Sequence, residues 1–178
     1  MYEFVDDGPD RAVDPTGANR CIFETDAGAH HGLIVDNWTI RNGKWVKIGT
    51  IQYDFSVQVS PWGLIGAAFF GGSGDLARTP NAPAPGPIII RIPSSPQEDL
   101  GAIGTLDAQA VNPPKYNWWL CNCNDWTTEN AFDGMKATSI PRGAEWTVYN
   151  KTHPIGGPHG WSGERGSHGD VMTGGARE

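Results

Sequence analysis

The sequence lacks the features that mark several common functional classes. Its lysines and arginines are scattered rather than clustered, and the formal net charge is −7 with a pI near 5.1. Because an acidic chain repels the phosphate backbone, nucleic acid is not an expected partner. The longest apolar run, Trp62–Phe70, is far shorter than the ~20 residues that a transmembrane helix needs, so no transmembrane segment is expected.

The first residues also lack the basic stretch and apolar run of a secretory signal peptide. We therefore expect a soluble protein made in the cytoplasm, either alone or as part of a particle. Cysteine is scarce, with three residues in the chain. Cys121 and Cys123 are too close in sequence to bridge readily, while Cys21 could pair with either of them. Reduced thiols are the simplest interpretation for a protein without an export signal.

Motifs for nucleotide binding and serine catalysis are absent as well. The glycines at 71–74 are not followed by the lysine of a phosphate-binding loop, and the segment Thr79–Pro87 is too rich in proline for the helix that a dinucleotide site requires. No serine lies in a Gly-x-Ser-x-Gly setting. We accordingly predict no cofactor and assign no catalytic residue.

The composition instead indicates a small core surrounded by loops. Gly (24) and Pro (14) are abundant, yet eight Trp and six Phe argue against disorder. We divide the chain into an acidic N-terminal arm (1–32), a β-rich core domain (33–150) and a Gly/His-rich C-terminal tail (151–178). The expected fold class is all-β: an antiparallel β-sandwich or barrel with long Gly/Pro-rich loops and extended termini.

The strongest local pattern is a β-hairpin from Leu33 to Val59. Asn42-Gly43 separates two apolar runs, and both residues of a type I′ turn need the positive φ that Asn and Gly accept. Apolar residues then alternate with polar ones from Ile51 to Val59, which predicts a strand with one buried face. Gly49 is expected to mark a bulge or bend.

Other segments give weaker signals. Short strands are predicted at Cys21–Glu24, Leu106–Val111 and Glu145–Tyr149, a buried strand at Trp62–Phe70, and a central strand in the β-branched run Pro87–Ile92. The segment Thr79–Pro87 is expected to be an extended loop. One or two helical turns are allowed only within Pro96–Ile103.

The aromatic segment Tyr116–Trp126 is the candidate binding region. Aromatic side chains combine a large contact area with a polar group and concentrate at recognition surfaces. The predicted binding residues are Tyr116, Trp118, Trp119 and Trp126. For the last three, core packing is an equally good interpretation, whereas Trp45, Trp62 and Trp146 are expected in the core.

Part of this region resembles a known family. The residues Gly104-Thr-Leu-Asp107, Pro113, Tyr116-x-Trp118-Trp119-x-Cys121 and Trp126-x-x-x-Asn130 are similar in order to a segment of the aegerolysins. That resemblance implies a small acidic β-sandwich that binds membrane lipids. It covers under a fifth of the chain, and the spacing from Cys121 to Trp126 is longer than in the family pattern.

Histidines and acids offer further candidates. His153, His159 and His168 could supply metal ligands, but their spacing matches no established site and they lie on glycine-rich chain. No metal site is therefore assigned. His30 and His31 are adjacent and should diverge on a strand, and Cys121 with Cys123 is weak evidence for a metal without a second pair. Glu129, Asp133, Glu145 and His153 could belong to an active site.

Three functional hypotheses follow. The first is a non-enzymatic structural or assembly subunit, for example of a viral or phage particle, whose arms contact neighbouring subunits or protein partners. The alternative is a lipid- or carbohydrate-binding module that uses the aromatic segment. The third is a small β-barrel enzyme with an unidentified site.

Overall fold

A single antiparallel sheet dominates the fold. The structure is a computed structural model that describes residues 19–25, 30–57, 71–117, 121–136, 140 and 143–152. The strands are β1 (Asn19–Thr25), β2 (His30–Arg41), β3 (Lys44–Val57), β4 (Gly72–Pro80), β5 (Ile88–Pro93) and β6 (Lys115–Tyr116). The helices are α2 (Pro96–Val111), α3 (Cys123–Asn130) and α4 (Ala144–Thr152). Strands account for 48% and helices for 30% of the described residues, which confirms the β-rich prediction.

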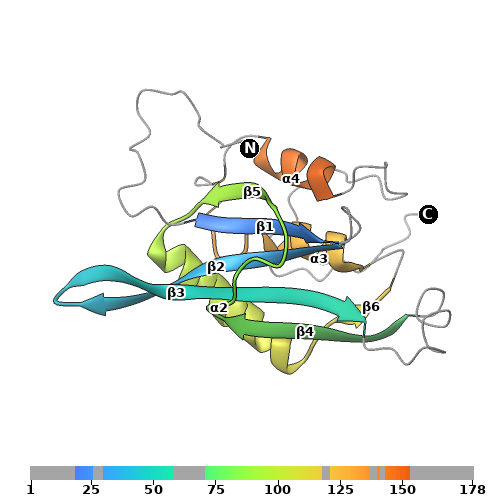
Figure 1. The fold of residues 1–178 in the computed structure, drawn as a ribbon, viewed down its shortest axis with the longest axis horizontal. Coiled ribbons are helices and arrows are strands. Elements are labelled where there is room, and N and C mark those ends of the chain that lie inside the picture. Colours follow the sequence, from blue (N-terminus) through green and yellow to red (C-terminus); the bar gives the residue numbers. More distant parts are fainter. Residues whose placement is uncertain are drawn as a thin grey trace, which may run out of the picture.

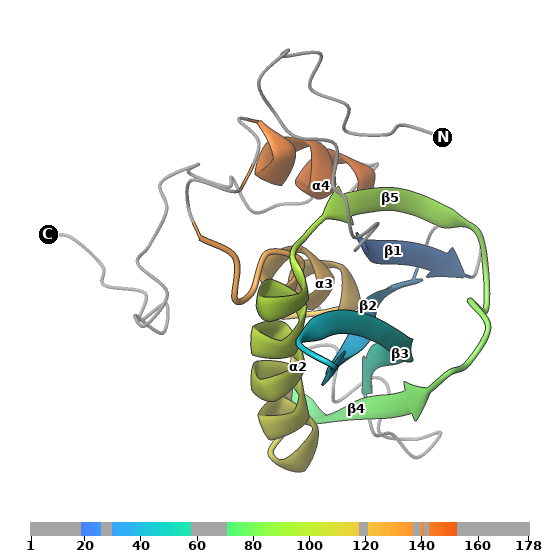
Figure 2. The same ribbon diagram turned by 90° about the vertical axis from the view of Figure 1, so that its left-hand side faces the viewer.

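The strands pair in the order β5-β1-β2-β3-β4-β6, and every neighbouring pair is antiparallel (Figure 1). The sheet is not closed. It curves around α2 and α3, which lie on its concave face (Figure 2). Within the described residues, the layer that covers the sheet is therefore helical, rather than a second sheet or the far wall of a barrel. The sheet also includes β1, so the core extends into the segment predicted as an N-terminal arm.

The predicted hairpin is confirmed as β2 and β3. Asn42 and Gly43 form its turn with φ of 51° and 72°, and Arg41 faces Lys44 across it. The predicted bulge is also present, because the register shifts opposite Asn37, which pairs with Gly49. Further along β3, the side chains of alternate residues are buried, as the alternation predicts. These are Ile51, Tyr53 and Phe55.

The strands after the hairpin differ in part from the prediction. The glycine-rich segment from Gly72 begins β4 and pairs with β3, so the expected loop starts at Asn81 rather than at Thr79. The β-branched run becomes β5, but it lies at an edge of the sheet rather than in its centre. Ile90 and Ile92 are nevertheless buried, because they contact the core beneath the sheet, whereas Ile88 and Ile89 are partly exposed. Trp62–Phe70 lies outside the described residues.

The largest error concerns α2, which replaces the strand predicted at Leu106–Val111 and extends well beyond the two turns allowed. Ser95 caps the helix and forms a reciprocal capping box with Glu98, and Pro96 occupies the first turn. Ala102, Ile103 and Leu106 then fall on one buried face. The capping signal was present in the sequence, but Gly101 and Gly104 disfavour a helix interior and concealed it.

The strand predicted at Glu145–Tyr149 is also wrong, because the segment is helix α4. Val148 is buried, whereas Trp146 is 54% exposed and stacks on Tyr149 with ring centroids 5.9 Å apart. The prediction that Trp146 belongs to the core is therefore wrong. Trp45 is half-buried, and Trp62 lies outside the described residues.

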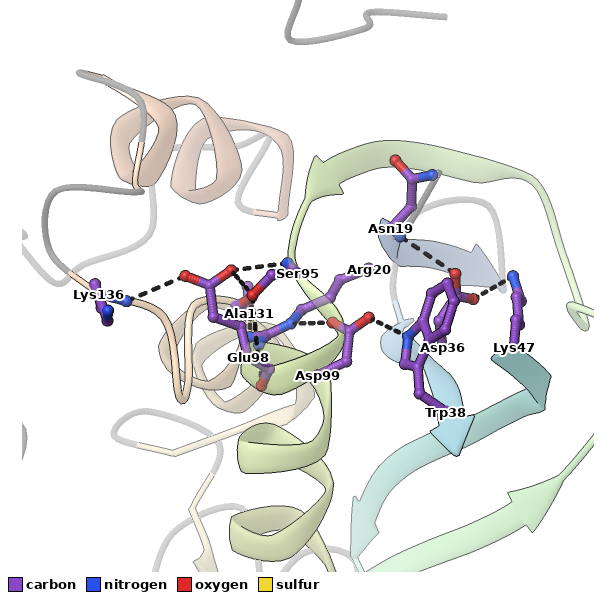
Figure 3. A network of polar contacts seen from close by, with 10 residues as sticks. All are labelled: Asn19, Arg20, Asp36, Trp38, Lys47, Ser95, Glu98, Asp99, Ala131 and Lys136. Carbon is purple, nitrogen blue, oxygen red and sulfur yellow. Dashed lines mark hydrogen bonds and ion pairs between the residues drawn. The ribbon is translucent and has the colours of Figure 1, made fainter. Parts of the chain in front are cut away.

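A buried polar network joins the sheet to α2 (Figure 3). Arg20 of β1 donates through Nε to Asp99 Oδ1 at 3.1 Å, and both side chains are fully buried. The Trp38 indole donates to the other Asp99 oxygen at 3.0 Å. The remaining Arg20 nitrogens donate to the carbonyl oxygens of Glu98 and Ala131. Every charge in this network is thus hydrogen-bonded, which is the condition for burying a charged pair.

Candidate functional site

The start of α3 fixes the position of Cys123. Asn122 caps this helix, accepting hydrogen bonds from the backbone N–H groups of Asn124 (2.8 Å) and Asp125 (3.1 Å). The Asp125 carboxylate accepts in return from the Asn122 N–H at 3.2 Å. Cys123 is consequently fixed as the first residue of the helix, where the partial positive charge of the helix N-terminus is strongest. Its side chain is nearly buried, at 6% exposed.

His30 and Asp54 approach this position from the sheet. His30 is the first residue of β2, and its Nε2 lies 2.7 Å from Oδ1 of Asp54 on β3. The two side chains are 20% and 30% exposed. The hydrogen bond holds the imidazole in one orientation at the accessible end of the two strands.

The pKa of His30 depends on both Asp54 in the sheet and Cys123 at the start of α3. Hydrogen bonds to Asp54 and then to the Cys123 side chain raise the pKa of His30 to about 10, against a smaller opposing effect of burial. His30 is therefore an imidazolium at neutral pH. One ring thus bonds both a cysteine at a helix N-terminus and a carboxylate.

This arrangement has a recognised chemical capacity. A cysteine nucleophile is activated by a neighbouring imidazolium and by a helix N-terminus, and a third polar group commonly orients the imidazole. Cys123, His30 and Asp54 have the residue types and the order of contacts that these roles need. Such constellations recur on unrelated folds and are recognised by geometry rather than by order in the chain.

Other groups surround Cys123 on the helix side. The adjacent His31 is fully buried and hydrogen-bonds to the Asn124 side chain rather than to Asp54. The two histidines therefore diverge, as predicted for neighbours on a strand. Burial raises the pKa of the Tyr116 phenol to about 12, and burial with a contribution from nearby Asp125 raises the pKa of the Glu129 carboxyl.

The three cysteines differ in their environments. None of them forms a disulfide, so the pairing left open for Cys21 is not made. Burial raises the pKa of Cys121 to about 12 and also raises the pKa of Cys21. Neither of these two thiols has the imidazole contact that distinguishes Cys123.

The predicted binding residues are divided by the structure. Tyr116 and Trp126 lie in the core, at 6% and 1% exposed, and both rings pack against Phe55. The Trp126 indole also donates to Gln109 of α2 at 2.7 Å. Trp118 and Trp119 lie outside the described residues, so an aromatic binding surface in this region now depends on them.

The sequence pattern missed the site because its members are far apart in the chain. His30 and Asp54 are 24 residues apart, and Cys123 follows much later. The signals that existed were local: adjacent histidines at a strand start, an acid on the polar face of β3, and Asn122 as a helix cap before Cys123. Of the acids and histidine suggested as active-site members, Glu129 lies near Cys121, while His153 lies outside the described residues.

The described residues contain neither a metal-binding cluster nor a membrane-spanning helix. Among the residues placed by the structure, no group of three or more His, Cys, Asp or Glu side chains could hold a metal ion. His159 and His168 lie beyond those residues, as does His153. In the same part of the chain, no helix combines the length and apolarity needed to cross a bilayer.

Comparison with known proteins gives no family assignment. No protein-family model, curated protein or solved structure matches the chain. Within the segment that resembles the aegerolysins, Gly104–Asp107 and Trp126–Asn130 lie in helices α2 and α3, and Tyr116 lies in strand β6. The geometry of Cys123, His30 and Asp54 is therefore the best indication of function in the described residues.

Proposed function

We propose that this protein is a cysteine-dependent enzyme that cleaves or transfers the acyl group of an amide or ester. Cys123 is the nucleophile, His30 the general acid and base, and Asp54 the residue that orients His30. The observation that carries this proposal is the position of one imidazole, bonded both to Cys123 at the start of α3 and to Asp54.

The reaction divides into two steps. In the first, the Cys123 sulfur attacks the acyl carbon, so that a carbon–sulfur bond forms and the bond to the leaving nitrogen or oxygen breaks. His30 gives its proton to that leaving group. In the second, neutral His30 takes a proton from water or another acceptor, whose oxygen or nitrogen attacks the thioester and releases Cys123.

Asp54 supports both steps without touching the substrate. Its carboxylate accepts from His30 Nε2 and so fixes the ring while stabilising the imidazolium form. The partial exposure of His30 and Asp54 leaves the imidazole accessible to a leaving group or a water molecule. Burial of the neighbouring Cys121 thiol keeps that residue in its protonated, unreactive form.

The proposal is tested by the rate at which each cysteine reacts with iodoacetamide at neutral pH, measured by peptide mass spectrometry on the native full chain. Cys123 should be alkylated faster than Cys21 and Cys121. His30→Gln should slow alkylation of Cys123 by at least about tenfold, since the imidazolium beside the sulfur is lost. Cys121→Ser is the matched control and should leave the Cys123 rate unchanged. Equal rates at all three native cysteines would overturn the proposal.

Turnover then tests the reaction class. Incubation with an activated ester should leave an acyl group on Cys123, visible as an added mass on its peptide, and Cys123→Ala should lack this adduct. The assembly and aromatic-binding hypotheses remain proposals of another class. They depend on the terminal segments and on Trp118 and Trp119, which lie outside the described residues.

A further inference from the structure

The end of the β2–β3 hairpin extends beyond the rest of the sheet (Figure 1). β1 pairs with β2 only as far as Val35, and β4 pairs with β3 only from Ile51 onward. The residues between them, 37–50, form a two-stranded ribbon; near its base, Trp38 bonds to Asp99 of α2. We call these residues the hairpin ribbon.

The hairpin ribbon carries exposed apolar side chains. Ile40 is 59% exposed and Ile48 is 47% exposed. Ile40 faces the half-buried Trp45 directly across the two strands, which places an aliphatic and an aromatic side chain on the same face. Large apolar groups held at a projecting tip have little to gain from the domain's own core, so their burial requires another surface.

The charge of the hairpin ribbon differs from that of the whole chain. Residues 37–53 contain no Asp or Glu, although the chain has a net charge of −7. Arg41 and Lys44 are exposed and flank the turn, while Lys47 is paired with Asp36 at 2.5 Å. The hairpin therefore brings basic residues close together around Ile40 and Trp45, although basic residues are scattered along the chain as a whole.

We propose that the hairpin ribbon docks on the surface of an anionic lipid bilayer. Ile40 and Trp45 enter the boundary between headgroups and acyl chains, and Arg41 and Lys44 contact lipid phosphates. The combination of apolar side chains with flanking cations is that of interfacial membrane anchors. A purely electrostatic partner such as nucleic acid would leave Ile40 and Ile48 in water.

The backbone limits how deep this docking goes. In the described structure, residues 39–46 pair only with one another, so the outer N–H and C=O groups of both strands need water or headgroups. Such groups are too costly to place in hydrocarbon. The hairpin ribbon therefore binds reversibly at the interface and does not insert across the bilayer.

Docking also fixes the direction in which the proposed active site faces. His30 begins β2 and the turn ends it, so the two lie roughly 35 Å apart along the strand at ~3.3 Å per residue. A domain attached by its hairpin ribbon holds Cys123 away from the lipid surface. This orientation favours water-soluble or protein-borne acyl substrates over bilayer lipids, a consequence that rests on the proposed function.

Flotation of the full chain with vesicles tests the proposal. Binding is compared between vesicles of phosphatidylcholine alone and vesicles that also contain phosphatidylserine. The wild type should float with the anionic vesicles and bind less at high salt. Ile40→Ser should weaken binding by about tenfold, and Lys44→Glu should weaken it by at least about fivefold. Val111→Ser removes a side chain that is 88% exposed at the end of α2 and should change nothing.

The outcomes separate this proposal from the proposed function. Because Ile40 and Lys44 are exposed, their variants should retain the wild-type circular dichroism spectrum and the wild-type alkylation rate of Cys123. Absence of wild-type binding to anionic vesicles, or equal losses in Ile40→Ser and Val111→Ser, overturns the docking proposal. A change of oligomeric state in Ile40→Ser without a change in vesicle binding would assign the surface to a second copy of the chain and also overturn it.

Discussion

The Nδ1 atom of His31 lies 2.6 Å from Oδ1 of Asn124, the residue that follows the proposed nucleophile. The same oxygen lies 3.5 Å from the Cys123 sulfur. His31 is fully buried, whereas the adjacent His30 is partly exposed and bonds to Asp54. Two neighbouring histidines therefore hold the start of α3 in different ways, one through the helix side chain and one through the proposed catalytic contacts.

This difference predicts that equivalent substitutions of the two histidines have opposite consequences. His31→Gln should lower the free energy of unfolding by about 1–3 kcal/mol, because a buried hydrogen-bond partner of Asn124 is lost or misplaced. Near pH 10, where the charge of His30 no longer contributes much, His30→Gln should cost less stability than His31→Gln, since His30 is nearer the solvent; at neutral pH it should slow the alkylation of Cys123. Urea denaturation and alkylation rates measured on both variants check the prediction. Equal losses of stability would show that His30 is also mainly structural.

The raised pKa of His30 predicts a specific dependence of stability on pH. A histidine whose folded-state pKa lies above its unfolded value of about 6.5 stabilises the fold fully below that value. The contribution is then lost as the pH rises towards about 10, the pKa that Asp54 and then Cys123 give to His30. Between pH 6 and pH 10, the wild type should therefore lose more stability than His30→Gln.

Two measurements check this pH dependence. Urea unfolding at several pH values gives the stability difference between wild type and His30→Gln, and the NMR titration of the His30 ring gives its pKa directly. Asp54→Asn is the matched variant, because it keeps the shape of the partner and removes its charge. It should bring the pKa of His30 down, and an unchanged titration would show that Asp54 does not set it.

The tryptophans give a third prediction. Trp126→Ala should lower the free energy of unfolding by about 3–5 kcal/mol, because the ring fills the core beside Phe55 and donates to Gln109. Trp146→Ala removes a residue of the same type that is 54% exposed and should cost less than about 1 kcal/mol. Thermal or urea denaturation of both variants decides between a core role and a surface role for Trp126. A stable Trp126→Ala protein that had lost ligand binding would instead support the binding role that the sequence predicted for Trp126.

The features that could be predicted from sequence are those with local causes. The hairpin follows from two residues that accept positive φ, Asn42 and Gly43, and from the alternation of apolar and polar residues along Ile51–Phe55. Both patterns are local, so the hairpin could be predicted without knowledge of the tertiary structure. Helix α2 had an equally local start in Ser95 and Glu98, but internal glycines obscured its length. The site had no comparable signal, because only the pairing of β2 with β3 and the packing of α3 bring His30, Asp54 and Cys123 together.

The fourth prediction concerns the buried pair of Arg20 and Asp99. Burial pulls the pKa of Arg20 below its usual value and raises the pKa of Asp99, whereas the contact between the two groups acts in the opposite direction on both and favours their charged forms. Asp99→Ala should lower the free energy of unfolding by about 3–5 kcal/mol, because it leaves the Arg20 charge buried without its partner.

A matched pair on the surface and a double variant make this prediction specific. Arg78→Ala breaks a contact to Asp107 in which the two side chains are 37% and 39% exposed, and it should cost at most about 1 kcal/mol. Replacing both buried partners, as in Arg20→Met with Asp99→Leu, should recover much of the stability lost in Asp99→Ala, because no unpaired charge remains. Urea denaturation of the four proteins measures all of these values. If the double variant were less stable than Asp99→Ala, the cost would come from lost hydrogen bonds to Glu98, Ala131 and Trp38 rather than from the stranded charge.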